Sequence, residues 1–492
     1  MATSVSVPLV MRTAHRATTS QAEGNMHPTK HEDGTKIMSL ASAATALADH
    51  RYATTAGAIL ELVENSVRSG ASTVEVFVAA RKRRQITTWS GTRNHSQIGR
   101  IAVLDNGAGM DPATMQLALQ FGGTTGAAEC LRGIGLPSAS ISECKRVDVW
   151  SWQNGPENAN HTYLDFEAIR EGQQTEVPEP QPKSIPKRWR EAARNVPIGE
   201  SGTMVVWSKL TVPRLQAAEA LHQELTDRIG RSFRRWLAAG KHNAYVTEFY
   251  WKQPTASLSH VVRTLDPLDL LPAPWRRERQ GPSCFAPFPD LATHEVSIPV
   301  VFDGKEHLVS ARFSMLRPEF LEWWFSSANP SRALISPGLH GLSVVRAGRE
   351  ILQDRTFAVD RSLQPQLWRA EISFEPALDA FFGLANNKQE VRNLSAANQL
   401  ALSDLLSKPG QTAAQVRDEL AAKDDPRAPW VEVMAVLESR RDAMLWAIAE
   451  AKSAHRKVRE GRQAEEQPTM NRAREIREEL QRPGAVMPTA PC

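Results

Sequence analysis

Three short clusters of acidic, amide and glycine residues contain the side chains of this sequence that are best suited to chemistry. The first spans residues 61–66 (ELVENS), the second residues 105–110 (DNGAGM) and the third residues 133–140 (GIGLPSAS). Each cluster alone is weak evidence, because polar helix residues, Asx turns and glycine-rich helix starts are common without any ligand. Their order along one stretch of the chain makes them worth interpreting together.

The first cluster pairs a carboxylate with a carboxamide on a predicted helix. Apolar residues at 59, 62, 63 and 67 have helical spacing. Glu61 and Asn65 are four residues apart, so they project from the same helix face. Their oxygens are suited to hold a water molecule and Mg²⁺. Glu64 falls on a different face, and we expect it to be a solvated surface acid.

The second cluster lies where a predicted strand ends and a helix begins. The strand contains apolar residues at 101, 103 and 104, and the helix starts at Asp111-Pro112 with the aspartate as its N-cap. Asp105 at the strand end can accept a hydrogen bond from an exocyclic amine such as that of adenine. Gly107 and Gly109 allow the backbone to turn and to approach a flat ligand.

The third cluster is a glycine-containing helix start that follows the Gly- and Thr-rich residues 122–126. Small residues at the beginning of a helix present free N–H groups to an anion, and the helix dipole assists. No Lys-Ser or Lys-Thr pair follows these glycines, which argues against a Walker-type P-loop.

Together the three clusters resemble the motifs of the GHKL, or Bergerat-fold, ATPases, the superfamily of the DNA gyrase ATPase, MutL mismatch-repair proteins, heat-shock-ninety chaperones, histidine kinases and MORC proteins. ELVENS at 61–66 is similar to the MutL version of the first motif. DNGAGM, followed by Phe121-Gly122 and GIGLPSAS, is most similar to bacterial MORC-type ATPases. Gly202-Thr203, before a predicted strand at 204–207, resembles the fourth motif.

This resemblance implies ATP and Mg²⁺ as cofactors and gives each cluster a role. Glu61 is then the general base that orients the attacking water, and Asn65 is the Mg²⁺ ligand. Asp105 would recognise adenine. The other residues implied in the nucleotide site are Gly107, Gly109, Met110, Gly133, Ile134, Gly135, Leu136 and Thr203.

The resemblance continues into a second domain. Residues 343–350 (SVVRAGRE), 368–372 (WRAEI) and 387–389 (NKQ) are similar to segments of MORC-type transducer domains. In these relatives a transducer lysine reaches the γ-phosphate, which makes Lys388 the candidate catalytic lysine of this chain. Because such a cation would respond to the γ-phosphate, ATP would favour one interdomain arrangement.

Two positions depart from the motifs of these relatives. Arg68 and Ser69 stand where ELVENS-containing relatives carry Asp-Ala, and the glycine that opens their phosphate-binding box is replaced near Cys130. These departures predict slow turnover, or a protein in which nucleotide binding matters more than hydrolysis.

The pattern along the chain predicts an α+β protein with a Bergerat-fold ATPase domain (an α/β sandwich), a transducer-type α/β domain and a helical C-terminal segment. Residues 154–200 are rich in Pro, Gln and Glu and are predicted to be largely loop. Apolar patterning predicts strands at 74–78, 101–104, 204–207, 296–302, 308–313 and 342–346. The predicted divisions are a disordered leader (1–37), the ATP-binding domain (38–215), the transducer-like domain with its connecting helix (216–405), a helical segment (406–465) and a flexible tail (466–492).

The charge balance gives no indication of a nucleic-acid partner by itself. The formal net charge is +4, from 59 Lys and Arg against 55 Asp and Glu. For the basic clusters at 81–84, 231–235 and 275–279 the alternatives are contact with a phosphate backbone and solvated surface, and we favour solvated surface. The first of these clusters follows a predicted strand, and we expect it at a hairpin tip. A narrow apolar seam at Val433, Leu437, Met444 and Ile448 is too short, and too interrupted by arginines, to predict a coiled coil.

Cysteine usage and hydropathy indicate a cytoplasmic protein. The four cysteines are far apart and have no metal-ligand spacing, which favours reduced thiols. The sequence has no run of 18 or more apolar residues, so we expect no transmembrane helix.

We therefore expect an Mg²⁺-dependent ATPase in which ATP binding drives homodimerisation or domain closure, with DNA or a DNA-associated protein complex as its target. A heat-shock-ninety-like chaperone and a non-hydrolysing, ATP-bound scaffold are alternatives. A histidine kinase is a further alternative, although His50 lies only eleven residues before Glu61 and leaves no room for a phospho-accepting helical hairpin.

Overall fold

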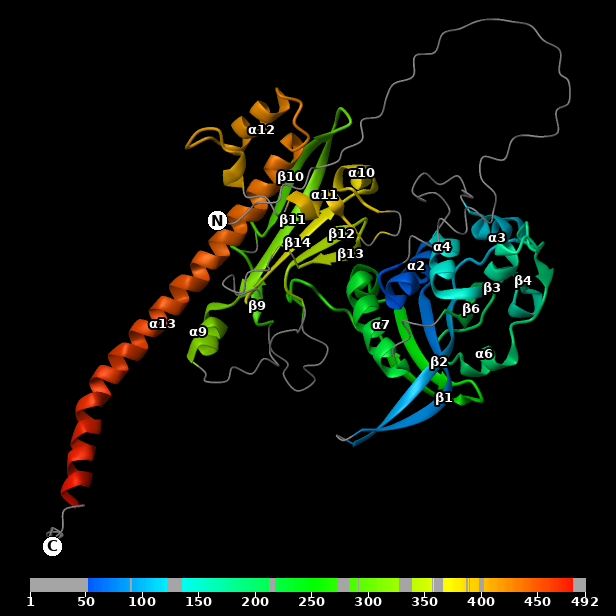
Figure 1. Cartoon of the computed structure of the whole chain (residues 1–492), viewed down its shortest axis with the longest axis horizontal. Helices are drawn as coiled ribbons and strands as arrows, with labels where there is room; N and C mark the ends of the chain where they lie inside the picture. Colours follow the sequence, from blue (N-terminus) through cyan, green and yellow to red (C-terminus); the bar gives the residue numbers. More distant parts are fainter. Residues whose placement is uncertain are drawn as a thin grey trace, which may run out of the picture.

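The computed structural model describes residues 52–88, 91–121, 135–211, 217–271, 283–290, 292–326, 339–355, 357, 366–385, 388, 390–397 and 402–480. Within these ranges the side chains of 82–96, 256, 461–470 and 472–480 are left undescribed. The leader expected at 1–37 and the basic cluster at 275–279 lie outside the described residues. The described residues form two sheet-containing units and a long C-terminal helix (Figure 1).

The first unit is built on an eight-stranded sheet with the order β5-β4-β3-β6-β2-β1-β7-β8. Neighbouring strands are antiparallel except for β1 and β7, which run parallel. The strands are β1 (Thr73–Thr88), β2 (Gly91–Asp105), β3 (Cys144–Trp152), β4 (Asn160–Asp165), β5 (Gln181–Pro182), β6 (Gly202–Leu210), β7 (Asn243–Tyr250) and β8 (Gln253–Val261).

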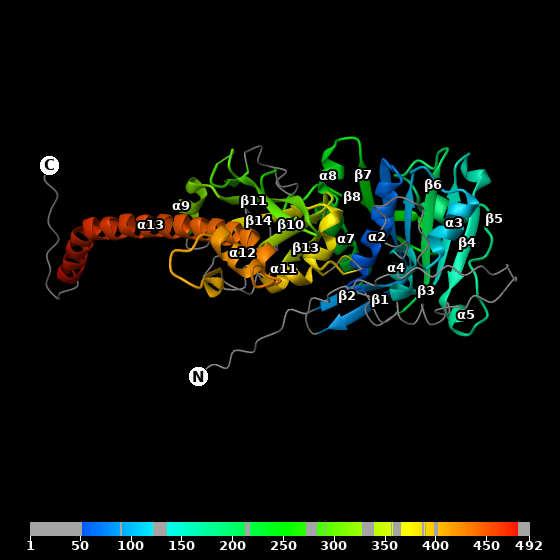
Figure 2. The ribbon, with the colours of Figure 1, turned by 90° about the horizontal axis from the view of Figure 1, so that it is seen from above.

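Helices pack on both faces of this sheet, and α2 (Thr55–Arg68) and α7 (Ala218–Ser232) lie on the side toward the second unit (Figure 2). Their apolar faces bury Ile59, Leu62 and Leu221 on one side, and Trp189 with Phe77 on the other. The first side holds α2 (Thr55–Arg68), α3 (Pro112–Leu119), α4 (Gly135–Glu143) and α7 (Ala218–Ser232), and the second holds α6 (Lys187–Ala192). The unit is therefore an α/β sandwich, as the sequence predicts.

The first unit extends beyond the boundary predicted at residue 215. Its core includes residues of α7, and β7 and β8 continue its sheet next to β1. Eight backbone positions of β1, from Thr73 to Ala80, align with β7. The expected "connecting helix" is thus part of the first core, because α7 packs on β1 and β7 rather than leading away from them.

The region expected to be mostly loop, 154–200, also contains regular elements. It includes a short 3₁₀ helix (Pro156–Asn158), β4, α5 (Phe166–Arg170), β5 and α6. Trp189 on α6 is 2% exposed, because it packs against Phe77, Phe249 and Trp251. A few buried aromatic contacts therefore order a segment whose composition is typical of a loop.

The second unit is a smaller mixed sheet with the order β10-β11-β14-β12-β13, in which β9 also pairs with β11. β12 and β14 are parallel, whereas the other pairs are antiparallel. Its strands are β9 (Phe285–Pro287), β10 (Glu295–Phe302), β11 (Lys305–Leu316), β12 (Leu342–Arg346), β13 (Arg349–Asp354) and β14 (Trp368–Phe374). The helices of this unit are α9 (Pro318–Ser326), α10 (Asp379–Phe382), α11 (Arg392–Ala397), α12 (Ala413–Ala421) and α13 (Val431–Leu480), whereas α8 (Arg234–Ala238) follows α7 and packs in the core of the first unit.

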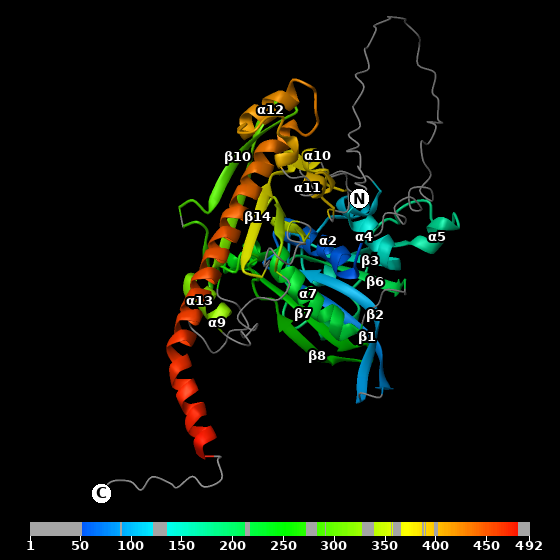
Figure 3. The same cartoon turned by 60° about the vertical axis from the view of Figure 1, so that its left-hand side comes forward.

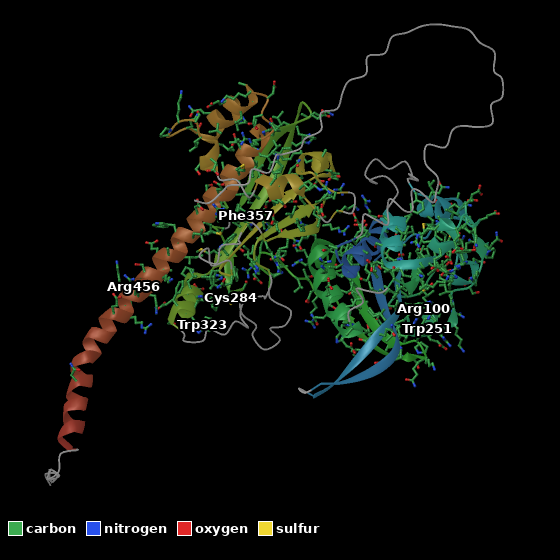
Figure 4. The ribbon with its side chains drawn as sticks, in the orientation of Figure 1. Arg100, Trp251, Cys284, Trp323, Phe357 and Arg456 are labelled. Carbon is green, nitrogen blue, oxygen red and sulfur yellow. The ribbon has the colours of Figure 1, made fainter. Side chains whose placement is uncertain are left out.

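The apolar seam of the C-terminal helix belongs to the core of the second unit. Val433, Leu437, Met444 and Ile448 are at most 2% exposed and pack with the residues of this sheet. Beyond them α13 leaves the body of the molecule, and Arg456 lies on the projecting part (Figures 3 and 4). The helix continues to Leu480, past the predicted division at 465.

Of the arginines at 231–235, Arg235 is exposed as expected, but Arg231 and Arg234 are not solvated, contrary to our expectation. Arg234 is 6% exposed and contacts Glu371 of β14, and Arg231 Nε lies 2.5 Å from a Glu350 carboxylate oxygen on β13. These pairs join the first unit to the second. Arg81 is exposed, but it lies within the long strand β1 rather than at a hairpin tip. None of the helices in the described ranges has the length and apolar composition needed to cross a bilayer.

Candidate functional site

Helix α2 forms one wall of a cavity of about 260 Å³. The helix begins at Thr55, where the Thr54 side chain accepts a hydrogen bond from the Gly57 N–H. Glu61, Asn65 and Arg68 recur at helical spacing, and all three side chains line the cavity. The predicted pairing of Glu61 with Asn65 on one helix face is therefore present.

Asp105, the last residue of β2, lines the same cavity and is 5% exposed. One carboxylate oxygen accepts the Gly107 N–H at 2.9 Å, and the other accepts the Ser66 hydroxyl at 2.7 Å. Burial raises the pKa of Asp105, although these hydrogen bonds act in the opposite direction. Gly107 itself does not line the cavity; its N–H positions the carboxylate.

The turn after β2 requires a glycine at position 109. Gly109 has a φ of +67°, and a Cβ there would lie 2.0 Å from the Trp152 carbonyl oxygen. Its neighbour Met110 donates its backbone N–H to Ser151 Oγ at 2.8 Å, and that hydroxyl lies 2.9 Å from Thr203 Oγ1. Gly109, Met110 and Thr203 thus line the cavity together, although they come from separate segments.

The walls between these polar groups are largely apolar. They are formed by Leu62, Val103, Met110, Leu117, Ala118, Leu136 and Val205. A slot with apolar walls and one buried carboxylate suits a flat heteroaromatic ring that carries an amine. Glu61 and Ser66 are five residues apart on α2, so their backbones are separated by about 7–8 Å along the helix. The Glu61 end and the Asp105 end are therefore distinct parts of one cavity.

The start of α4 faces the Glu61 end. Gly135 is its first residue, and a Cβ on Gly135 would lie 3.5 Å from a Glu61 carboxylate oxygen. Gly135 and Leu136 line the cavity, whereas the predicted site residues Gly133 and Ile134 lie outside the described residues. A helix start at this position can bind an anion.

Lys388, from the second unit, completes the cavity. Its ammonium lies 3.1 Å from one oxygen of Glu61 and 2.7 Å from an oxygen of Glu64. The backbone of Lys388 has a φ of +52°, a conformation uncommon for a residue with a side chain. It is fixed in part by a hydrogen bond from the Lys388 N–H to the Ala385 carbonyl.

A second cation from the same unit, Arg349, contacts the same two carboxylates. Arg349 Nη1 lies 3.0 Å from Glu61 Oε1 and also contacts Glu64 Oε2. Burial acts to raise the pKa of Glu64, but the charges of Arg349 and Lys388 outweigh burial and lower this pKa to about 2. The four side chains form a compact cluster of two acids and two bases across the boundary between the units.

This cluster corrects the expectation that Glu64 is a solvated surface acid. Glu64 is 9% exposed, because the second unit packs against its helix face. Sequence reasoning also missed Arg349, Ser66 and Ser151 as supporting residues. For Ser66 there was a signal, since it lies one residue after Asn65 and four residues after Leu62, another residue of the cavity wall. Arg349 gave none that local spacing could reveal.

The donor groups at the Glu61 end fit a hydrated divalent cation accompanied by an anion. The Glu61 carboxylate and the Asn65 carboxamide supply oxygens, which Mg²⁺ prefers, and Lys388 supplies a positive charge for the anion.

Comparison with known proteins gives one family match. Residues 52–196 match the family described as histidine kinase-, DNA gyrase B- and HSP90-like ATPase. No curated protein matches the chain. A solved structure titled as the N-terminal domain of a DNA repair protein is similar over 73% of this chain and 94% of that chain, with 12% sequence identity and a TM-score of 0.40.

Proposed function

We propose that this chain, whose residues 52–196 form a domain of the histidine kinase-, gyrase B- and HSP90-like ATPase family, is an Mg²⁺-dependent ATPase. One observation carries the proposal. A single cavity gathers the predicted site residues from four separated segments of the first unit and one lysine from the second. The residues concerned are Glu61, Asn65, Asp105, Gly109, Met110, Gly135, Leu136, Thr203 and Lys388.

The Asp105 end is the proposed adenine site. The carboxylate would accept a hydrogen bond from the exocyclic amine, and the apolar walls would contact the ring faces. Ser66 and the Gly107 N–H hold the carboxylate in position, while Ser151 links Met110 to Thr203. The ring would therefore meet a site whose polar groups are already oriented.

The Glu61 end is the proposed phosphate site. Asn65 would bind Mg²⁺, which supplies neutralisation of phosphate charge. Gly135 and Leu136, with Gly133 and Ile134 before them, would donate backbone N–H groups to the phosphates. Glu61 would orient the attacking water as general base.

Glu61 is not ready for this role in the described arrangement. One of its oxygens is paired with Arg349 and the other with Lys388. Transfer of Lys388 to the terminal phosphate would release Glu61 Oε2 for the water. Lys388 would thereby couple the presence of that phosphate to the position of the second unit.

ATP binding would then act by favouring one arrangement of the two units. We propose that this change drives homodimerisation or domain closure and that its target is DNA or a DNA-associated protein complex, as the MORC- and MutL-like motifs imply. The proposed location is the cytoplasm, which rests on the widely spaced cysteines.

A non-hydrolysing, ATP-bound scaffold is the second candidate. The observation in its favour is that both carboxylate oxygens of Glu61 are paired with cations. If Lys388 did not move, neither oxygen would be available to orient a water molecule, and turnover would be slow. Measurements of ATP binding and of ATP turnover separate the two candidates.

Calorimetry and steady-state turnover of the full chain with Mg-ATP test the proposal. We expect Glu61→Ala to lower turnover by at least about 100-fold, the usual contribution of a general base, and to preserve ATP binding. Glu460→Ala, at an exposed position of α13, is the control and should behave as wild type. Normal turnover in Glu61→Ala would refute the role of Glu61. Absence of Mg-ATP binding to the wild-type protein would refute the function, and binding without turnover would favour the scaffold.

A further inference from the structure

The acid–base cluster between the two units has two layers. Glu61 and Lys388 line the cavity, whereas Glu64 and Arg349 are not among its lining residues. Glu64 Oε2 contacts both cations, and Glu61 contacts each of them with a different oxygen. A ligand in the cavity would therefore meet Lys388 directly and Arg349 only through the two acids.

Arg349 has a contact with the first unit in addition to those with the two acids. It is the first residue of β13 and follows the tight turn at Ala347-Gly348, where both residues have positive φ. Its side chain is 11% exposed, and its guanidinium lies 5.5 Å from the centre of the Phe233 ring. A guanidinium also keeps its charge and can contact two carboxylates at once. These contacts anchor Arg349 between the sheet of the second unit and the end of α7.

We propose that Arg349 is a positioning residue for Glu61, that Glu64 holds it in place, and that this pair is a lasting contact between the units, whereas the contact of Lys388 is exchangeable. The inference deepens the proposed function and rests on it. In the described arrangement two cations neutralise two buried carboxylates. When Lys388 moves to a terminal phosphate, Arg349 remains in contact with both acids.

The free energy of buried charges supports this division of roles. Removing the partner of a buried charge is strongly unfavourable, because the remaining charge is neither solvated nor paired. If Arg349 were absent and Lys388 moved away, Glu61 and Glu64 would lie close together after losing both cations of the cluster. Lys388 would then be retained by the acids. Arg349 thus lowers the free-energy cost of moving Lys388 and keeps Glu61 oriented through Oε1.

The test is a double-mutant cycle in the full-length protein with Arg349→Ala, Glu64→Gln and the combined variant. Each single change is expected to lower kcat by about 10- to 100-fold, the usual effect of losing a residue that orients a functional group. The dissociation constant for Mg-ATP should stay within about threefold, since neither residue lines the cavity. The combined variant should be no slower than the slower single variant, because the two residues act as one unit. Arg349→Lys, which keeps the charge, should recover part of kcat.

Arg346→Ala is the matched control. Arg346 belongs to the same β12–β13 hairpin, its side chain is 3% exposed, and it pairs with Asp379 at 2.6 Å, away from the two acids. Its loss should lower the melting temperature without lowering kcat of the folded protein. Equal losses of kcat in Arg346→Ala and Arg349→Ala would overturn the inference, as would multiplicative effects of Glu64→Gln and Arg349→Ala.

A second measurement separates this inference from the proposed function. If the wild-type protein binds no Mg-ATP, the function itself fails. If it binds Mg-ATP without turnover, hydrogen exchange decides. We expect the nucleotide to change exchange around Lys388 while the backbone of 342–354 remains protected. Loss of protection in that hairpin on nucleotide binding would overturn the role of Arg349 alone.

Discussion

Replacing Asp105 by asparagine should weaken Mg-ATP binding without unfolding the protein. In the described structure one carboxylate oxygen accepts the Gly107 N–H and the other accepts the Ser66 hydroxyl. The asparagine oxygen can keep the Gly107 contact, and its NH₂ group then faces Ser66. The Ser66 hydroxyl can accept from this NH₂ group and direct its own hydrogen to the Leu62 carbonyl, which is already 3.2 Å away.

The substitution mainly weakens the hydrogen bond between residue 105 and the ligand. The NH₂ group presents a donor to the exocyclic amine of adenine where the carboxylate presents an acceptor. A hydrogen bond to a charged group contributes about 1.5–3 kcal/mol, so the dissociation constant should rise by about 10- to 150-fold. The internal rearrangement exchanges one hydrogen bond for another and should cost about 1 kcal/mol or less.

Titration calorimetry with Mg-ATP and thermal melting of both proteins measure the two quantities. Asp111→Asn is the matched control, because Asp111 caps α3 outside the cavity and asparagine is an equally good N-cap. The control should bind ATP as wild type does. If Asp105→Asn binds Mg-ATP with unchanged affinity and melts at the same temperature, the assignment of the adenine site to Asp105 is refuted.

Two further predictions concern stability. The charges of Arg349 and Lys388 outweigh the opposing effect of burial and lower the pKa of Glu64 from 4.5 to about 2. The ionised Glu64 carboxylate should therefore stabilise the fold by about 3 kcal/mol above pH 4.5 and lose this contribution as the pH falls toward 2. Urea unfolding from pH 6 to 3 should show a steeper decline for wild type than for Glu64→Gln; parallel curves would contradict this. Ile448→Ala should cost about 2–5 kcal/mol because the side chain is 1% exposed, whereas Val458→Ala, at 53% exposure, should cost about 0.5 kcal/mol or less. Equal unfolding midpoints in urea would exclude α13 from the second core.

Local sequence signals predicted the parts of the fold that depend on short-range physics. Alternating valines place a strand at 74–78, and the Asp111-Pro112 pair begins α3 as expected. The same holds for β12, whose predicted bounds 342–346 match the structure. In each case neighbouring residues decide the backbone conformation, either by periodicity or by capping.

Long-range packing decided what the sequence left open. Composition made 154–200 look like a loop, but contacts of Trp189 with aromatic residues of β1, β7 and the turn after β7 order it. The division at 215 failed because β7 pairs with β1, a contact between residues about 170 positions apart. No local pattern encodes such a pairing.

The sequence by itself determined the types and spacing of Glu61, Asn65 and Asp105, and with them the chemistry that the cavity can support. The tertiary structure alone decided which charges meet there. The position of Glu64 in its helix predicts a surface acid. Glu64 is nevertheless buried against Lys388 and Arg349, which lie 324 and 285 residues later in the chain. The periodicity of a helix predicts the face from which a side chain projects. Which part of the chain packs on that face is decided only when the whole chain folds.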